Sequence, residues 1–219
     1  MSKARTESDL SAQLDADFTS RLRELSDLKR TIRDADPNAQ QVLLKALVTI
    51  SYAHWEGHVK FAASKYFEYV ALRRLTYISL QQQFYVNSFL VRLGAFVANR
   101  PSLKTRCDLI SEALNPGNAC FSQVHPELVN TGSNLKFEIL QNICLVCGID
   151  CAIFQPYETF IDLVLLRRRN SIAHGDESVV DVHEVDELID GVVELMRLFR
   201  NQVENKVYTQ AYLASSRGR

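Results

Sequence analysis

The stretch LLRRRNSIAHGD, residues 165–176, is the segment of the sequence that says most about fold and function. An apolar run meets three consecutive arginines here and is followed by Asn170, His174 and Gly175. Glycine at this position is typical of the residue that ends a helix in the left-handed conformation, which puts His174 in the last turn. The unpaired carbonyls of such a turn favour a protonated imidazole. The stretch therefore predicts a helix that ends with cations beside a histidine.

Spacing along this expected helix decides which side chains can meet. Asn170 and His174 are four residues apart and therefore share a face. Arg167 and Ser171 flank the same face. Arg169 lies five residues before His174, about 140° around the helix, so only its long side chain allows it to reach the histidine. Two interpretations stay open at this point: a functional site, or an arginine-rich last turn that complements the helix dipole and carries a capping histidine.

The rest of the chain also predicts helices almost throughout. Glycine and proline are sparse, and no alternating strand pattern is convincing. Apolar residues recur every three or four positions from Leu10 to Ile32, and Asp36-Pro37 ends this first helix and begins the next. Further helices are expected at about 37–69, 81–98, 102–114, 134–147 and 156–174. Residues 115–133 form the longest irregular region, and a loop of this length is often a lid or a mobile segment.

The last predicted helix is the most regular one. It opens with Asp181-Val-His-Glu184, a carboxylate variant of the capping box. Its apolar residues keep a strict three-four spacing, as in the seams of helix bundles and of dimers. They are Val182, Val185, Ile189, Val192, Met196, Phe199 and Val203. The residues from Thr209 onwards are polar, and we expect them to form a flexible tail.

Charge and hydropathy exclude several classes of protein. The formal net charge of −1 argues against a protein that binds polyanions over its whole surface, so any contact with nucleic acid must come from local patches. The first residues, MSKARTESDL, contain no apolar segment of an export signal. No window approaches the roughly 18 uninterrupted apolar residues of a membrane span. We therefore expect a soluble, cytoplasmic protein without a membrane contact.

The five cysteines allow two interpretations. Their odd number excludes a complete disulfide framework. The Cys-x-x-Cys spacing of Cys144 and Cys147, with Cys151 nearby, is compatible with zinc. However, Leu140 and Ile143 fall on the same apolar helical face as the first two cysteines. Buried, reduced thiols are the commoner outcome of such a pattern, and we expect no metal.

The pattern Arg-Asn-x-x-x-His, from Arg169 to His174, lies near the end of a late helix and resembles the HEPN superfamily (higher eukaryotes and prokaryotes nucleotide-binding). A second stretch, YAHWEGHVK at residues 52–60, is similar to the Trp-Glu helix of a bacterial HEPN branch found among toxin and phage-defence genes. The loop into a helix near Asn134 and the pattern RRNxIAHG also match that branch. The resemblance spans roughly residues 40–205.

This resemblance implies an all-α, HEPN-like helical bundle with an additional N-terminal helix. The expected parts are an N-terminal helix over 1–36, a HEPN-like helical domain over 37–208 and a flexible tail over 209–219. The first helix and the tail lie outside the resemblance.

The segment HWEGH also invites a comparison with zinc proteases. His54 and His58 are four residues apart, as two metal ligands on one helix would be. The protease motif needs glutamate directly after the first histidine, where this chain has Trp55, and we reject it. Trp55 is most simply a core residue, and Glu56 is placed to pair with Lys60. The resemblance leaves a role for Glu56 in the active site open.

Many HEPN proteins are metal-independent ribonucleases, and the resemblance implies an endoribonuclease that needs no cofactor. RNA carries its own nucleophile, the ribose 2′-hydroxyl. Histidine suits either proton role because its unperturbed pKa, about 6.5, lies near working pH. Arginine suits the phosphate because its planar fork stays charged. We thus expect catalytic roles for His174, Arg169 and Asn170. Supporting roles are expected for Glu56, Ser171 and Arg167.

The expected partners follow from the same resemblance. One motif supplies a single histidine and a single arginine, and the family solves this by facing two motifs across a dimer. The regular last helix makes a homodimer plausible. As a toxin or antiphage effector, the protein would bind RNA and a cognate antitoxin or a defence-system subunit. Two alternatives remain: a catalytically inactive HEPN module that binds RNA or a nucleotide, and a helical adaptor whose cationic turn docks a partner.

Overall fold

The computed structural model describes residues 3–99, 101–114, 117–176 and 180–214. Helices of several kinds make up the fold of these residues, and no strand occurs among them. The described part contains two isolated β-bridges, between Thr76 and Cys120 and between Leu80 and Leu213. The prediction of an all-α helical bundle is confirmed.

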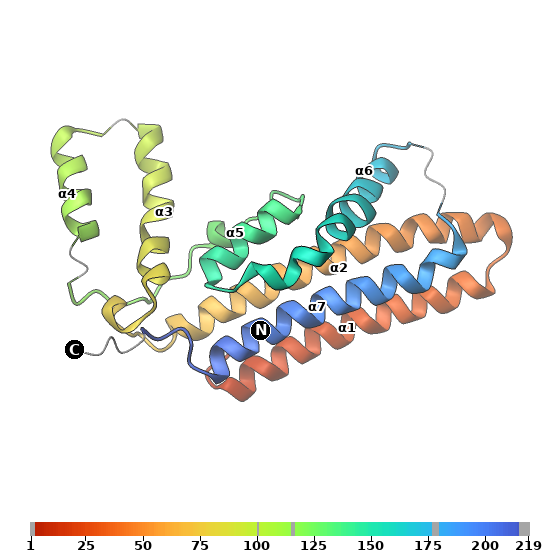
Figure 1. Ribbon diagram of the computed structural model, residues 1–219, viewed down its shortest axis with the longest axis horizontal. Helices are drawn as coiled ribbons and strands as arrows, with labels where there is room; N and C mark the ends of the chain where they lie inside the picture. Colours follow the sequence, from red (N-terminus) through yellow and green to blue (C-terminus); the bar gives the residue numbers. More distant parts are fainter. Residues whose placement is uncertain (1–2, 100, 115–116, 177–179, 215–219) are drawn as a thin grey trace.

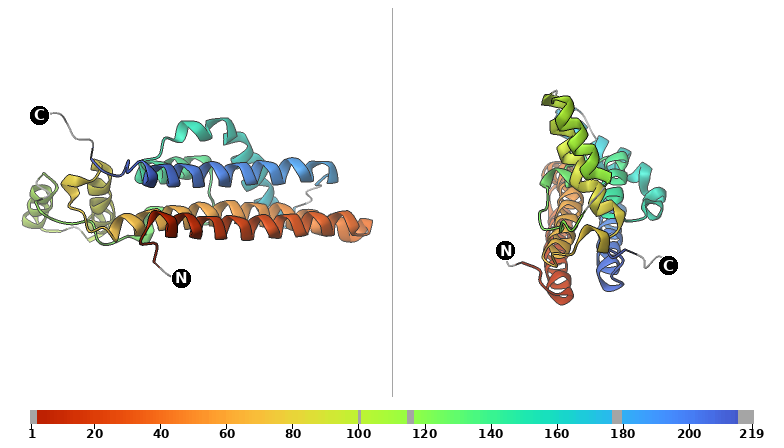
Figure 2. Two further views of the ribbon diagram at one scale, coloured as in Figure 1. Left: turned by 90° about the horizontal axis from the view of Figure 1, so that it is seen from below. Right: turned by 90° about the vertical axis from the view of Figure 1, so that its left-hand side faces the viewer.

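Three long helices form the body of the molecule (Figures 1 and 2). They are α1 (Glu7–Asp34), α2 (Pro37–Ala71) and α7 (Val185–Tyr208). In Figure 1, α2 returns antiparallel to α1, and α7 runs parallel to α2 and contacts both helices. The α1–α2 boundary lies where the sequence predicts it, because the Asp36 carboxylate accepts hydrogen bonds from the first free N–H groups of α2. The division of the chain at residue 36 stays a prediction.

The regular apolar face of α7 is buried inside this chain. Val192, Met196, Phe199 and Val203 are fully buried against α1 and α2. Fully burying such a side chain contributes about 1.5–3 kcal/mol. The spacing therefore belongs to a bundle seam within one chain, and this face is not available as a seam between two copies.

The motif segment lies across α2, together with α5 (Phe137–Cys147) (Figure 1). The single helix expected over 156–174 consists instead of different helical forms. They include the 3₁₀-helix η3 (Cys151–Tyr157), the π-helix η4 (Phe160–Arg167) and α6 (Arg168–Ala173). Pro156 has no N–H to donate to a regular α-helical ladder, which fits the tighter form at this point. The π-helix adds a residue per turn and changes the direction of the side chains before α6.

The helices α3 (Gln82–Asn99) and α4 (Leu103–Leu114) project away from one end of the bundle (Figures 1 and 2). No described residue of α4 is buried. Several large apolar side chains are exposed on this pair of helices: Val86, Leu90, Leu93, Leu103, Ile110 and Leu114. The two helices exist as predicted, but they contribute little to the core.

The irregular region expected over 115–133 is partly packed. It contains a short 3₁₀-helix, η2 (Pro126–Val129), and the side chains of Phe121 and Thr131 are buried. Residues 115–116 lie outside the described part. Phe121 and Thr131 therefore anchor the region to the rest of the protein.

The prediction of a flexible tail from Thr209 is wrong for residues 209–214. Tyr212 is buried, and its carbonyl accepts a 2.9 Å hydrogen bond from the Gln81 N–H. The N–H of Ala214 donates to the carbonyl of Ser79 at 3.0 Å. The buried ring of Tyr212 and these backbone hydrogen bonds therefore fix the segment to the end of the bundle, and residues 215–219 lie outside the described part.

The start of the last helix also differs from the capping box expected there. Asp181 accepts a hydrogen bond from the His183 N–H and begins a 3₁₀ turn, η5 (Val182–Glu184). Among the described contacts, the Glu184 carboxylate does not return to the Asp181 N–H but binds Arg168, with an Nη2–Oε2 distance of 2.6 Å. This ion pair joins the motif helix to the beginning of α7.

In the part of the chain that the structure describes, no helix is long and apolar enough to cross a membrane.

Candidate functional site

The end of the motif helix has the expected geometry. Gly175 adopts a φ of +80°, and the His174 N–H donates to the Asn170 carbonyl at 3.0 Å. The N–H of Asp176 reaches the Ser171 carbonyl at 3.0 Å, which closes the last turn. The His174 side chain is exposed, and its ring forms no hydrogen bond or ion pair with another described residue. The imidazole is thus open to a ligand from solvent.

The three consecutive arginines point to different surroundings. Arg167 is exposed and has no hydrogen-bond or ion-pair partner among the described side chains. Arg168 is bound to Glu184. Arg169 is partly buried and turns toward α2. The run of equal charges is therefore divided among solvent, α7 and α2.

Arg169 lies between α2 and the turn that precedes α5. Its guanidinium carbon is 4.2 Å from the centre of the Tyr52 ring, a distance at which a cation is attracted to the ring face. Its Nη2 donates to the Ser133 carbonyl at 2.5 Å and lies 3.4 Å from Oδ1 of Asn134. Its Nε is buried and has no hydrogen-bond partner in the described part of the chain. The guanidinium is therefore held by the protein's own groups.

Glu56 belongs to the same neighbourhood. Its carboxylate accepts a hydrogen bond from the buried Thr131 hydroxyl, and it also contacts Lys60 Nζ at 3.4 Å, the pair expected from the sequence. The Tyr52 hydroxyl accepts a 2.6 Å hydrogen bond from the Leu135 N–H. Burial raises the pKa of Tyr52, and the Glu56 carboxylate adds to the rise, while the Leu135 N–H and the Arg169 guanidinium act against it.

The structure thus brings Arg169 and Glu56 to one cluster, which we call the Arg169 cluster: Tyr52, Glu56, Thr131, Ser133 and Arg169. No hydrogen bond or ion pair between described atoms joins it to the His174 ring. Asn170 and Ser171 are partly exposed on α6, between the cluster and the helix end.

Sequence reasoning missed three members of the cluster: Tyr52, Thr131 and Ser133. Tyr52 could have been found, because it lies four residues before Glu56 on the same helical face. Thr131 and Ser133 lie in an irregular region and carry no comparable signal.

The histidines of HWEGH lie away from this cluster. Nδ1 of His58 is 2.7 Å from the Asp17 carboxylate, which also binds the Arg21 guanidinium. His54 contacts the same arginine, and Trp55 is fully buried in the core. Both histidines therefore connect α2 to α1.

A metal centre finds no support in the described residues. No group of three or more histidine, cysteine or carboxylate side chains among them is arranged to hold a metal ion. Cys144 and Cys147 are buried, and burial raises the pKa of Cys147 to about 12. Buried thiols of this kind are the structural cysteines that the apolar face of α5 predicts.

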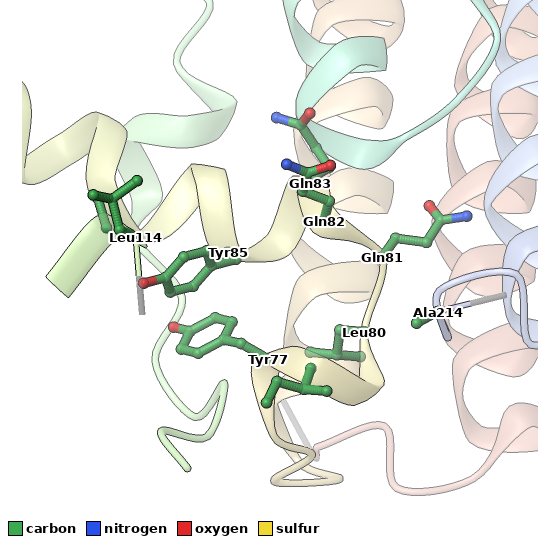
Figure 3. A pocket seen from close by; sticks show the side chains of 10 residues that line it. Tyr77, Leu80, Gln81, Gln82, Gln83, Tyr85, Leu114 and Ala214 are labelled. Carbon is green, nitrogen blue, oxygen red and sulfur yellow. The ribbon is translucent and has the colours of Figure 1, made fainter. Parts of the chain in front are cut away.

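A hollow of about 810 Å³ lies at the other end of the molecule (Figure 3). Its walls come from the base of α3, the end of α4 and Ala214, and they include Tyr77, Tyr85 and Leu114. None of its lining residues belongs to the motif or to the Arg169 cluster, so size alone does not identify the functional site here.

The fold and the motif define the class of the protein: an all-helical bundle with Arg-x-x-x-x-His at the end of a helix. The model of the family described as RiboL-PSP-HEPN matches residues 16–205, and the chain belongs to this HEPN family. The match begins inside α1, earlier than the resemblance at about residue 40 indicated. No curated protein and no solved structure matches the chain.

Proposed function

We propose that this HEPN protein is a metal-independent endoribonuclease that cleaves RNA by attack of the ribose 2′-hydroxyl, and that it acts as a toxin or an antiphage effector. The observation that carries the proposal is the exposed imidazole of His174 at the end of α6, five residues after Arg169, which forms no hydrogen bond or ion pair with any residue that the structure describes. Family membership supports a ribonuclease or an RNA-binding module in general.

The proposed reaction needs two proton transfers and no cofactor. The 2′-oxygen loses its proton to a base and forms a bond to the neighbouring phosphorus. The bond from phosphorus to the 5′-oxygen breaks, and the leaving oxygen takes up a proton from an acid. The products are a 2′,3′-cyclic phosphate and a 5′-hydroxyl. An imidazole can serve as base or acid, because it exchanges protons near neutral pH. We assign one of these two roles to His174.

Cations near the histidine would stabilise the charge that develops on the phosphate. We assign this role to Arg169, with Arg167 in support. Arg167 and His174 are seven residues apart, about two helical turns, and both are exposed. Asn170, which lies one turn before the histidine, would orient the imidazole or the phosphate, and Ser171 would support it.

A second proton carrier is needed for the complete reaction, and we propose that a second copy of the chain supplies it. The buried face of α7 cannot form this contact. The end of α6 is exposed, so a twofold axis near it would face two His174 side chains toward one phosphate. A cognate antitoxin or defence-system subunit would act by covering this end or by preventing the pairing.

The decisive experiment is cleavage of RNA by the pure protein in the presence of a chelator. We expect 2′,3′-cyclic phosphate or 3′-phosphate ends with 5′-hydroxyls, and no cleavage when the scissile nucleotide carries a 2′-deoxyribose. Products with 5′-phosphates, or a strict requirement for magnesium, would contradict this mechanism.

The toxin role is tested by overexpression in growing cells. Toxicity of the wild type that disappears in His174→Ala would support this role, and equal effects of wild type and His174→Ala on growth would contradict it.

One observation favours the alternative of a binding module without catalysis. The Arg169 guanidinium donates a hydrogen bond to the Ser133 carbonyl of its own chain, so this N–H group does not point into solvent where a phosphate would bind. An inactive module would still bind RNA in a salt-dependent way, but it would leave the RNA intact.

A further inference from the structure

The turn over residues 131–135 is fastened to α2 by two side chains one helical turn apart. The Thr131 hydroxyl donates to the Glu56 carboxylate, and the Leu135 N–H donates to the Tyr52 hydroxyl. Thr131 is 2 % exposed and Tyr52 is 3 % exposed, so both bonds are shielded from water. Breaking a buried bond by removing one partner typically costs about 1–3 kcal/mol, because the other partner loses its hydration without compensation.

The same turn has an unusual backbone. Gly132 and Ser133 are both left-handed, with φ values of +57° and +61°. Glycine adopts this conformation freely, but a residue with a Cβ does so at a cost, and it persists where the surrounding contacts determine it. The carbonyl of Ser133 is the group that accepts the hydrogen bond from Arg169. The direction of this carbonyl therefore depends on how firmly the turn is held.

Tyr52 also contacts Arg169 directly, because the guanidinium lies over the face of the Tyr52 ring. One residue thus fixes both the turn that binds the arginine and the plane in which the arginine lies. The buried Nε of Arg169 has no hydrogen-bond partner among the described residues, so hydrogen bonds within this part of the chain do not fully determine the position of the guanidinium.

We propose that Tyr52, Glu56 and Thr131 are positioning residues that orient the Arg169 guanidinium by fixing the 131–135 turn. The consequence for catalysis rests on the proposed function, in which Arg169 binds the scissile phosphate. The orientation of Arg169 itself does not depend on that function, so the two can be tested separately.

The test is the NMR signal of the Arg169 Nε–H group in the full-length protein. Because this group is buried, its proton exchanges slowly with water and gives a signal of its own, which is assigned by its loss in Arg169→Lys. We expect Thr131→Val, which keeps the shape but removes the hydroxyl, to shift this signal and to speed up its exchange. Thr131→Ser, which restores a hydroxyl, should return both to wild-type values.

A matched control separates orientation from general loosening. Thr49 lies on α2, and its hydroxyl donates to the Lys45 carbonyl of its own helix and to no other described residue. Thr49→Val should leave the Arg169 signal unchanged. Tyr52→Phe is a second variant in case Thr131→Val does not fold: it keeps the ring beneath the guanidinium and removes the hydroxyl that accepts the hydrogen bond from Leu135. An Arg169 signal that stays at its wild-type position in folded Thr131→Val or in Tyr52→Phe would overturn the proposal.

Cleavage assays on the same proteins test the consequence. If the protein cleaves RNA, Thr131→Val should lower kcat/KM by roughly ten- to a hundredfold, the order of loss caused by misplacing a reacting group by about 1 Å, and Thr131→Ser should restore it. A changed Arg169 signal with unchanged cleavage would overturn the link between orientation and activity. If wild type does not cleave RNA, the proposed function fails, while the NMR result still decides the orienting role of the three residues.

Discussion

Three adjacent arginines with the same charge have different surroundings, and this difference can be measured. Arg169→Ala should lower the cleavage rate about a hundredfold or more, the usual loss when a group that stabilises transition-state charge is removed. Arg167→Ala should cause a smaller loss, because the exposed side chain only supports the site. Arg168→Ala is the matched control: it breaks a partly exposed ion pair worth about 0–1 kcal/mol and should leave cleavage nearly unchanged. Equal losses in all three variants would contradict these separate roles.

His174 is expected to be necessary for cleavage but not for folding. His174→Ala should lower the rate by about 10²–10⁴, the contribution of a positioned acid or base. Because the side chain is exposed, the free energy of unfolding should change by no more than about 0.5 kcal/mol in a denaturation experiment. His183→Ala, at another exposed histidine, serves as the control and should affect neither quantity. Asn170→Ala should lower the cleavage rate less than His174→Ala does, since a positioning group transfers no proton.

At the scale of elements, the contact between α1 and α2 should make stability depend on pH. Burial, followed by the charge of Arg21, lowers the pKa of His54, although Glu24 and Asp17 act in the opposite direction. The folded state therefore binds a proton less readily at this position than the unfolded state. The resulting stability is complete above the ordinary pKa of 6.5 and is lost as the pH falls through the lower value in the folded protein.

Urea denaturation measures this effect. The free energy of unfolding should fall between about pH 7.5 and about pH 5, and the fall should be smaller in His54→Gln, which has no titratable group at this position. Asp17 affects the free energy of unfolding in a lower pH range than His54 does. Burial raises its pKa, but the bonds from His58 and Arg21 outweigh burial and lower it, so its contribution is lost only as the pH falls below 3.8. An equal slope in wild type and His54→Gln above that range would exclude His54 as the cause.

The close approach of α7 to the π-helix η4 depends on a glycine. A Cβ at position 191 would overlap the ring of Phe160, the first residue of η4. Gly191→Ala should therefore destabilise the protein by about 1–3 kcal/mol, the cost of overpacking. It should also move the segment that leads to the motif and lower cleavage. Asp190→Ala, at the neighbouring exposed position, is the control for thermal denaturation. An unchanged Tm in Gly191→Ala would mean that this contact is not tight.

At the scale of the whole molecule, the proposed working unit is a homodimer with a composite site. If wild type is mixed with an equal amount of Arg169→Ala/His174→Ala and subunits exchange, about a quarter of the dimers are fully wild type. A composite site should then retain about a quarter of the activity of pure wild-type dimer, and independent sites about half. Light scattering at the assay concentration gives the mass. A fully active monomer would contradict the composite site.

Much of the fold could be predicted because the relevant signals are local. The Asp36-Pro37 boundary and the helix end at Gly175 lie where expected, since a cap acts on backbone groups within about one turn. Apolar periodicity likewise identified which face of α7 is buried. Periodicity cannot say what covers that face, and the helices α1 and α2 of the same chain do so. The packing of Tyr212 was equally invisible in a polar tail.

In the candidate site, too, some features follow from local sequence and others depend on tertiary packing. The sequence alone determined that His174 ends a helix, with Asn170 on its face, because both statements depend on spacing within a few residues. Only the tertiary structure decided where Arg169 points: its acceptor, Ser133, is 36 positions away in the sequence. The anchor of that turn pairs Tyr52 with Leu135 across 83 positions. Helix periodicity and capping are set by neighbours along the chain, whereas the direction of a long side chain is set by whichever distant segment packs beside it.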